Sequence, residues 1–349
     1  MHYIIAIIFI VTLIMAFVED YMKEVHKAAI LVLYAIIFIV LASTKSVENT
    51  ADAENYERMF YNNDDFLIEL ATEPSFIYLS RFVLSFGGTI MTIFFIYALI
   101  SVPAKILALS KLTPYIFTAL LIYVPVYFEL HDMIQIRAGA AAAFLMLSLI
   151  SLSKKKYLYA ALLMIVAFFF HYSAAVFFPF LLLGNRKLNY VGRIVLGLLV
   201  PIGFAMYLMK KDLFSFIPSA LTMGKLDLYK ETSDKGQWTD IVLPYKNLYF
   251  MTKCIILYLC LYFYDYIAEK NRYAPMLINL FAASLFITLS MATIPVIAGR
   301  IGDLFGIVDC IVFTFCLYIV VPKYVPRIAI SMVGLYMLIY NMIFTEYFT

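Results

Sequence analysis

The stretch Glu129-Leu-His-Asp-Met-Ile-Gln-Ile-Arg-Ala-Gly-Ala-Ala-Ala-Ala143 joins a group of ionisable side chains to an apolar helix built of small residues. Two carboxylates, a histidine, a glutamine and an arginine come first, and alanine and glycine follow. Small residues let neighbouring helices approach closely in a membrane. Ionisable residues at the same depth mark functional sites. The stretch therefore predicts one wall of a functional site in a membrane bundle.

The rest of the chain is compatible with hydrocarbon. Of the 349 residues, 64% are hydrophobic and 14% are charged, and the mean hydropathy is +0.92. A soluble domain is roughly half apolar and about a quarter charged. No polar linker separates the chain into halves. We therefore predict an all-α, polytopic membrane helical bundle that forms a single integral-membrane domain over residues 1–349.

The apolar runs predict about twelve transmembrane segments, since a span of hydrocarbon needs about 20 residues. They lie near 3–18, 28–43, 76–100, 113–129, 134–152, 157–170, 173–184, 190–209, 246–267, 274–297, 304–321 and 328–346. The runs at 157–170 and 173–184 are short. Two short spans or one helical hairpin that enters from one side would both fit this pair.

Basic residues in short connections set the orientation, because such residues gather on the cytoplasmic side of a membrane. They are Lys105, Lys111, Lys154, Lys155, Lys156, Arg186, Lys187, Lys270, Arg272, Lys323 and Arg327. With twelve spans these connections fall on one side, which we assign to the cytoplasm. Both termini and two larger loops, at about 44–75 and 210–245, then face outward.

With this topology, unusual polar residues from four regions of the chain meet at the outward ends of the spans. They are Glu73, the cluster between Glu129 and Arg137, His171, and Arg300 with Asp303. The hydrophobic pattern alone does not require this coincidence. We therefore expect one site that faces outward.

The two arginines each allow two interpretations. Arg137 would grip a phosphate through its planar guanidinium, or it would snorkel to lipid headgroups. Arg300 lies in Ala298-Gly-Arg-Ile-Gly-Asp303, so it would bind an anion or pair with Asp303 one helical turn later.

The histidines and acids of the predicted site are equally ambiguous. His171, in Phe168-Phe-Phe-His-Tyr-Ser173, would act as a general base or as a hydrogen-bonded connector between helices. His131 and Asp132 have the same two interpretations. Glu73 precedes Pro74, and it would act as a base or would only cap the helix that follows.

No motif for a cofactor or a metal is present in the sequence. A glycine-rich phosphate loop between a strand and a helix is missing, and the four cysteines lie inside apolar runs without the spacing of metal ligands. We therefore expect no cofactor, no metal and no nucleic-acid partner. An enzyme of this kind would take an activated substrate that is already in the membrane.

Several short motifs, in the same order along the chain, resemble those of EpsG-like proteins. They are Asp52-x-x-x-Tyr56, Tyr61, Glu73-Pro74-x-Phe76, Asp132-Met-Ile-Gln135-Ile-Arg137-x-x-x-Ala141, Phe170-His171-Tyr-Ser173 and Arg300. The resemblance spans residues 52–303. Many relatives have Arg-Gln in the central helix, whereas Gln135 precedes Arg137 in this sequence and Ala138 follows it.

EpsG-like proteins belong with the bacterial O-antigen and exopolysaccharide polymerases of the Wzy type. The resemblance implies a glycosyltransferase in the bacterial inner membrane, with its active site on the periplasmic or outer face, that makes surface polysaccharide such as the O-antigen of lipopolysaccharide. Donor and acceptor would be undecaprenyl-pyrophosphate-linked oligosaccharides in the lipid bilayer. A membrane protein that regulates chain length stays open as a further partner.

The hypothesis for the reaction is an inverting, metal-independent displacement in which a sugar hydroxyl attacks the anomeric carbon and undecaprenyl pyrophosphate leaves. Three residues are candidates for the catalytic base, in the order Glu73, His171 and Asp132. The candidates for binding substrate or pyrophosphate are Arg137, Arg300, Gln135, His131, Tyr56 and Asp303.

Two functions of other classes remain as alternatives. A lipid-linked oligosaccharide flippase or other transporter would need polar groups along a path through the bundle, for which Asp265, Asp309 and Lys253 are the available residues. A polysaccharide acyltransferase would also use a histidine, but it needs a route for an acyl donor that the sequence does not reveal.

Overall fold

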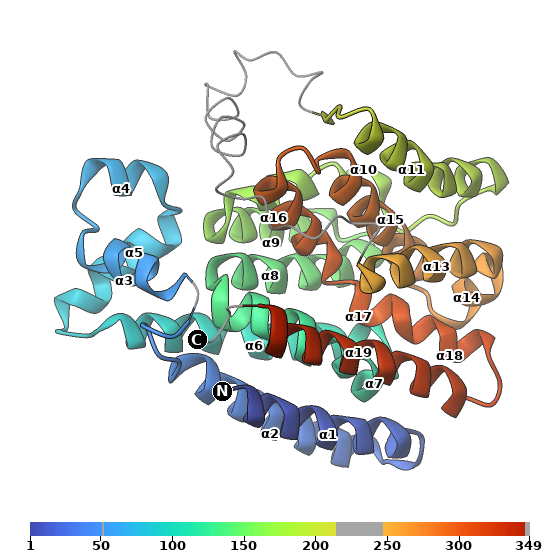
Figure 1. The fold of residues 1–349 in the computed structure, drawn as a ribbon, viewed down its shortest axis with the longest axis horizontal. Helices are drawn as coiled ribbons and strands as arrows, with labels where there is room; N and C mark the ends of the chain where they lie inside the picture. Colours follow the sequence, from blue (N-terminus) through green and yellow to red (C-terminus); the bar gives the residue numbers. More distant parts are fainter. Residues whose placement is uncertain (51, 214–246, 346–349) are drawn as a thin grey trace. The chain divides into compact units, whose positions relative to one another are not determined.

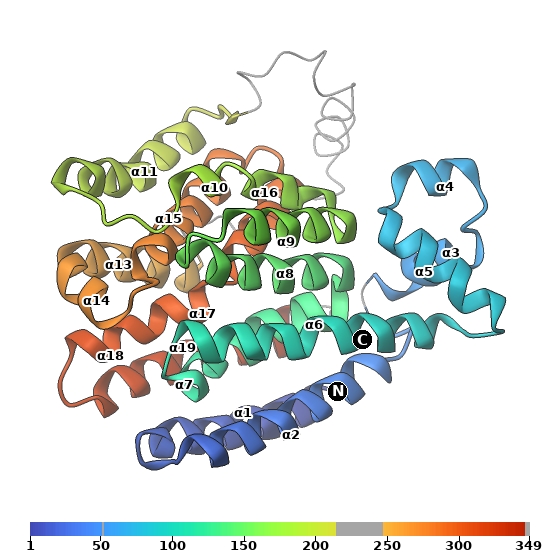
Figure 2. The ribbon, with the colours of Figure 1, turned by 180° about the vertical axis from the view of Figure 1, so that it is seen from behind.

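A computed structural model describes residues 1–50, 52–213 and 247–345 of the protein. Within these ranges the chain forms helices, turns and connections and no β-strand (Figures 1 and 2). A helix pairs its backbone N–H and C=O groups within one segment, as a lipid environment demands. The prediction of an all-α fold is confirmed. Most of the predicted outward loop at 210–245 lies outside the described residues.

The chain divides into two compact units. The first unit holds Met1–Gly184 and Cys316–Thr349, and the second holds Asn185–Phe315. The prediction of one integral-membrane domain stays a prediction.

The first unit carries most of the predicted site residues. Its helices are α1 (His2–Val18), α2 (Glu24–Ser43), α3 (Ala53–Tyr61), α4 (Phe66–Ala71), α5 (Pro74–Ser85), α6 (Ile90–Leu112), α7 (Ile116–Ile122), α8 (Ile136–Ser153), α9 (Tyr157–Phe170), α10 (Phe180–Leu183), α18 (Cys316–Ile319) and α19 (Tyr324–Phe344). A π-helical stretch, Tyr123–Ile134, continues from α7, and single 3-10 turns follow α1 and α9. Helices α6, α8 and α9 run side by side, with α8 in the middle (Figures 1 and 2).

The second unit contains α11 (Tyr190–Leu208), α13 (Leu248–Tyr262), α14 (Tyr264–Lys270), α15 (Ala274–Ser290), α16 (Pro295–Gly306) and α17 (Asp309–Val312). Helix α15 packs against α11, α13 and α16. Helices α13 and α14 meet at an angle of 85°. Apolar side chains of α15 therefore form the centre of this unit.

Seven of the described helices are long and apolar enough to cross a membrane, and nine qualify if each of two bent pairs counts as one span. Three shorter apolar helices, Tyr157–Phe170, Tyr172–Leu182 and Ala274–Ser290, also coincide with predicted spans. The count of about twelve spans stays a prediction. The pair at 157–182 is two short helices joined at His171, not one continuous helix.

The predicted span at 76–100 is wrong. Helix α5 ends at Ser85, and Gly87 takes the left-handed φ of 70° that glycine adopts freely. The N–H of Gly88 donates to the Val83 carbonyl oxygen and closes the helix end. The spanning helix is α6, which continues to Leu112. Lys105 therefore lies buried inside a helix and not in a basic connection.

Hydrogen bonds at the two ends of the first unit fix the directions of its helices. Glu19, after α1, accepts from the Thr118 hydroxyl at 2.5 Å and from Arg327 at 3.3 Å. The end of α1 therefore meets the beginnings of α7 and α19. At the other end of α19, the Asn341 amide donates to Glu129 at 2.8 Å. Helix α7 and the π-helical stretch consequently run antiparallel to α1 and parallel to α19.

Candidate functional site

Glu73 is the centre of a buried charged cluster in the first unit. It stands directly before α5, whose first residue is Pro74, and only 4% of it is exposed. Its Oε2 pairs with Nη1 of Arg137, and its Oε1 lies 2.6 Å from Nδ1 of His171. One carboxylate therefore holds a guanidinium and an imidazole at the same time.

Three helix ends bring these side chains together. Arg137 is the second residue of α8, and His171 follows the last residue of α9 in an extended conformation, with φ of −156° and ψ of 121°. The partners lie 64 and 98 positions after Glu73 in the sequence. The cluster therefore depends on the packing of α8 between α6 and α9 and not on any local motif.

Aromatic rings hold the guanidinium from the side. The centre of the Arg137 guanidinium lies 5.3 Å from the ring centroid of Tyr56 and 5.8 Å from that of Phe76. Cations at this distance from an aromatic face are attracted by the ring. Tyr56 comes from α3 and is buried, and burial raises the pKa of its hydroxyl although the charge of Arg137 opposes the shift. The predicted role of Tyr56 near Arg137 thus has a geometric basis.

The electrostatics of the cluster keep Glu73 ionised. Burial raises the pKa of Glu73, but the hydrogen bond from His171 and the positive charge of Arg137 outweigh burial and lower that pKa from 4.5 to about 2. An ionised carboxylate only accepts hydrogen bonds. His171 therefore donates its Nδ1–H to Glu73, and in the neutral ring Nε2 is the atom that accepts a proton.

Two nitrogen atoms of this cluster have no hydrogen-bond partner among the described residues and are therefore suited to bind a substrate. His171 Nε2 and Arg137 Nε are buried and have no hydrogen-bond partner among the described residues. The side chains are 12% and 17% exposed, respectively, so the cluster is not sealed. Buried polar atoms are normally paired. A basic nitrogen and a charged donor next to each other are a suitable arrangement for an acceptor hydroxyl and an anionic leaving group.

Asp132 forms a separate, fully paired cluster. Its Oδ1 accepts from Ser101 at 2.6 Å and from Lys105 at 2.9 Å, and its Oδ2 accepts from Lys105 at 3.0 Å and from Tyr123 at 2.6 Å. The side chains of Asp132 and Lys105 are both fully buried. None of these four hydrogen bonds to Asp132 involves a residue of the Glu73 cluster. This arrangement leaves the carboxylate little capacity for a substrate proton.

The backbone immediately before Arg137 is held by two further contacts. Lys45, which is fully buried, donates to the Met133 carbonyl oxygen, and burial lowers its pKa to about 7. A Cβ added at Gly139 would overlap the carbonyl oxygen of His131. The π-helical stretch and α8 therefore touch backbone to backbone, and only glycine permits this contact.

Sequence reasoning missed Lys45 and Lys105 as parts of the site's support. The available signal was a lysine within an apolar run of 23 residues in the case of Lys105, since a charge at that depth needs a partner. Lys45 was hidden because it follows a span directly, where lysines commonly face water. The π-helical conformation of Tyr123–Ile134 was also not predicted, although such stretches often occur at functional sites.

The other predicted residues of the opening stretch occupy different surroundings. His131 is fully buried, and neither ring nitrogen has a partner among the described residues. Glu129 accepts from Asn341 through Oε2. Gln135 breaks the helix before α8, with φ of −92° and ψ of 62°. The stretch thus contains one residue of the Glu73 cluster, Arg137, and a set of buried residues next to it.

Arg300 and Asp303 belong to α16 in the second unit. Arg300 is exposed, and no ion pair between it and Asp303 or any other described residue is formed. The pairing that we considered as the alternative for Arg300 is therefore not observed. In the same unit, Lys253 of α13 pairs with Asp309 of α17 at 2.9 Å. The exposed side chain of Arg300 therefore has no acidic partner among the described residues.

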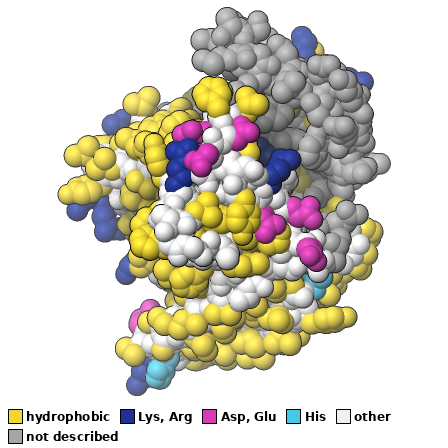
Figure 3. Space-filling model, turned by 90° about the vertical axis from the view of Figure 1, so that its left-hand side faces the viewer, with side chains coloured by type: hydrophobic (Ala, Val, Ile, Leu, Met, Phe, Trp, Pro, Cys, Tyr) yellow, Lys and Arg dark blue, Asp and Glu magenta, His cyan; other side chains and the backbone are white. Residues whose placement is uncertain are grey.

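Acidic side chains also gather on the face of the molecule that carries α3, α4 and α5 (Figure 3). Asp64 and Glu69 are exposed there, and both pair with Arg81, at 3.4 and 3.1 Å. Among the described residues no group of three His, Cys, Asp or Glu side chains is placed to hold a metal ion.

Comparison with known proteins identifies the family. The model of the EpsG family matches residues 29–348, which is nearly the whole chain. No curated protein and no solved structure matches the chain. The matched range includes Glu73, Arg137, His171 and Arg300. The chain belongs to the EpsG family, whose members are polysaccharide polymerase-like membrane proteins associated with the Wzy type.

Proposed function

We propose that the protein is a bacterial surface-polysaccharide polymerase that joins undecaprenyl-pyrophosphate-linked repeat units and releases undecaprenyl pyrophosphate. One observation carries the proposal: Glu73 holds His171 and Arg137 side by side while His171 Nε2 and Arg137 Nε have no partner among the described residues. Membership in the EpsG family supports the same class of reaction.

In the proposed reaction, His171 is the base. A sugar hydroxyl of the acceptor attacks the anomeric carbon of the donor, and its proton passes to Nε2 of His171. The electrons of the broken carbon–oxygen bond go to the leaving pyrophosphate. Glu73, with a pKa of about 2, is too weak a base for this step near neutral pH. We therefore rank His171 before Glu73, which positions the imidazole, and we place Asp132 last.

Arg137 is the proposed stabiliser of the leaving group. Negative charge grows on the pyrophosphate as the bond breaks, and a positioned cation lowers the energy of that transition state. Arg137 is held by Glu73 and Tyr56, so it needs no reorganisation during the reaction. Arg300 is the second candidate for the pyrophosphate. His131, Gln135 and Asp303 remain as proposed contributors to substrate binding.

The stereochemistry and location follow from the same proposal. A direct displacement inverts the anomeric centre, and a pyrophosphate leaves without the help of a metal because it is already activated. We propose that the site faces the periplasm or the outside of the inner membrane, where the lipid-linked repeat units are present.

The flippase alternative has less support, because Asp265, Lys253 and Asp309 are engaged in ion pairs within the second unit.

The test is the length of the surface polymer in cells that carry single variants, with the membrane level of each variant measured. We expect single repeat units and no long polymer with His171→Gln, and strongly shortened polymer with Arg137→Lys, which keeps the charge but loses the planar fork. Glu69→Gln, an exposed acid paired with Arg81, is the matched control and should leave polymer length unchanged.

Three results would contradict this function. Full-length polymer from His171→Gln and Arg137→Lys together would remove the catalytic assignment. Accumulation of lipid-linked repeat units on the inner leaflet in a deletion strain would favour a flippase, whereas accumulation on the outer leaflet agrees with a polymerase. Unchanged polymer length with loss of acyl groups would favour an acyltransferase.

A further inference from the structure

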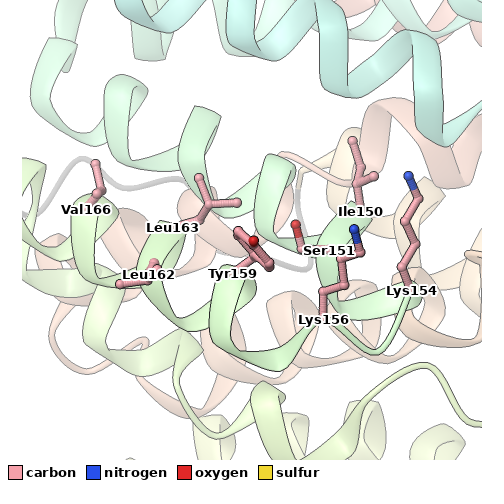
Figure 4. Close-up of a pocket in the computed structure, with 8 residues that line it drawn as sticks. All are labelled: Ile150, Ser151, Lys154, Lys156, Tyr159, Leu162, Leu163 and Val166. Carbon is pink, nitrogen blue, oxygen red and sulfur yellow. The ribbon is translucent and has the colours of Figure 1, made fainter.

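A cavity of about 360 Å³ lies between α8 and α9, near the turn that joins them. Its polar wall consists of Ser151, Lys154, Lys156 and Tyr159 (Figure 4). Arg137 lies at the beginning of α8 and His171 after the end of α9, whereas this turn joins the opposite ends of the two helices. The cavity is therefore separate from the Glu73 cluster.

The turn between the helices places two lysines on the same cavity. Lys155 has a left-handed φ of 57°, and the N–H of Lys156 donates to the Ser151 carbonyl oxygen at 3.0 Å. This conformation reverses the chain within three residues, so Lys154 and Lys156 both line the cavity while Lys155 does not. Two exposed lysine side chains thus line one cavity.

No acidic side chain among the described residues pairs with the lysines of this cavity. Neither Lys154 nor Lys156 forms an ion pair with any described residue, and the ammonium of Lys156 lies 5.7 Å from the ring centroid of Tyr159. Like charges that share a site repel one another. An anion between them would remove this repulsion and would find the Ser151 and Tyr159 hydroxyls as further donors.

The remaining wall of the cavity is apolar and continues along α9. Leu162, Leu163 and Val166 line it, and Leu162 and Val166 lie one helical turn apart on an exposed face. A free inorganic anion would make no favourable contact with this apolar wall. A ligand with an anionic end and a hydrocarbon chain would use both parts, and the basic turn has the charge that attracts acidic lipids.

We propose that this cavity binds one anionic glycerophospholipid, with its phosphate between Lys154 and Lys156 and an acyl chain along Leu162 and Val166. The site is independent of the polymerase reaction. It requires only the α8–α9 turn and the neighbouring residues of both helices.

The experiment is native mass spectrometry of the full chain in detergent, with phosphatidylglycerol and phosphatidylcholine of the same acyl chains added in equal amounts. We expect preferential retention of one phosphatidylglycerol. The double variant Lys154→Gln/Lys156→Gln should weaken this binding by about thirtyfold, since two lysines are lost at an anionic headgroup. Lys111→Gln, at an exposed lysine in the last turn of α6, is the matched control and should not change it.

A second variant tests the cavity without changing the charge. Ser151→Phe keeps both lysines but places a large side chain in the cavity wall, and it should also abolish preferential retention. Equal retention of phosphatidylcholine, or unchanged binding of phosphatidylglycerol to either variant, would overturn the proposal. Displacement of phosphatidylglycerol by free glycerol phosphate at the same concentration would also overturn the proposal. That result would assign the site to a soluble anion.

Discussion

Glu73 and Asp132 are two buried carboxylates in the same unit, and each is paired with a basic side chain. Asp132 receives four hydrogen bonds from Ser101, Lys105 and Tyr123. Glu73 receives one bond on each oxygen, and both of its partners keep a buried nitrogen that has no partner among the described residues. A saturated ion pair is suited to hold helices in place, and an unsaturated one is suited to bind a substrate.

The comparison also separates two kinds of burial. The side chains of Asp132 and Lys105 are fully buried, whereas those of Arg137 and His171 are 17% and 12% exposed. Perturbed ionisable groups mark functional sites only when substrate is able to reach them. The two acids are both buried, so their own burial does not distinguish them. The exposure and the free hydrogen-bonding capacity of their partners do.

The largest expected effect is on folding, at Asp132. Asp132→Ala leaves the buried Lys105 without its counter-charge, and breaking a buried pair from one side costs about 3–5 kcal/mol. We expect a strong loss of folded protein, measured as membrane level and as the melting temperature in detergent. A double variant Asp132→Ala/Lys105→Met should recover most of the loss, because no unpaired charge then remains.

The next effect is on catalysis, at His171. His171→Gln removes the proposed base, and loss of general base catalysis lowers a rate by about a thousandfold. The measurement is polymer formation by purified protein from lipid-linked repeat units, with the melting temperature as the control. Full activity would contradict the catalytic assignment, and a lowered melting temperature with full activity would assign His171 to a structural connection between α9 and the following turn.

The third effect is the pH dependence of stability that arises from Glu73. The pKa of Glu73 falls from 4.5 in the unfolded chain to about 2 in the folded protein. Its contribution, about 3 kcal/mol from this shift, is therefore complete above pH 4.5 and is lost as the pH falls toward 2. The melting temperature should decrease over this window in the native protein and less so in Glu73→Gln. Equal slopes in both proteins would show that Glu73 is not held in its ionised form.

The smallest effect is at the contact between the π-helical stretch and α8. Gly139→Ala adds a methyl group where the His131 carbonyl oxygen already lies, and such overpacking costs about 2 kcal/mol. Because Arg137 is two residues away, activity should fall more than the melting temperature suggests. Alanine has a higher helix propensity than glycine, so a loss of stability in Gly139→Ala reports the overlap with the His131 carbonyl oxygen.

Much of this architecture was predictable from the sequence. The apolar runs predicted most of the helices, and the side of the membrane that we assigned from the basic connections stays a prediction. These two patterns together led us to expect Glu73, Arg137 and His171 in one place, and the structure brings them within hydrogen-bond distance. The Gly87–Gly88 pair, which ends α5, is a turn signal that the hydrophobicity of residues 76–100 concealed.

The roles within the site were not predictable, because they depend on which helices pack together. Lys105 is one turn from Ser101 on α6, and only the packing of α6 against the π-helical stretch brings both onto Asp132. A sequence motif containing Asp132, Gln135 and Arg137 suggests a common function for all three. The structure instead assigns Asp132 and Arg137 to different clusters, and Gln135 marks the break between them.

The most direct test of the central claim is a double-mutant cycle between Glu73 and His171, measured as the rate of polymer formation by proteins of equal melting temperature. If Glu73 acts by positioning its two partners, the loss of rate caused by Glu73→Gln is much smaller once His171→Gln is present, because only the part that acts through Arg137 remains. A double variant whose loss equals the product of the two single losses would contradict the account, because Glu73 would then act on the substrate independently of His171.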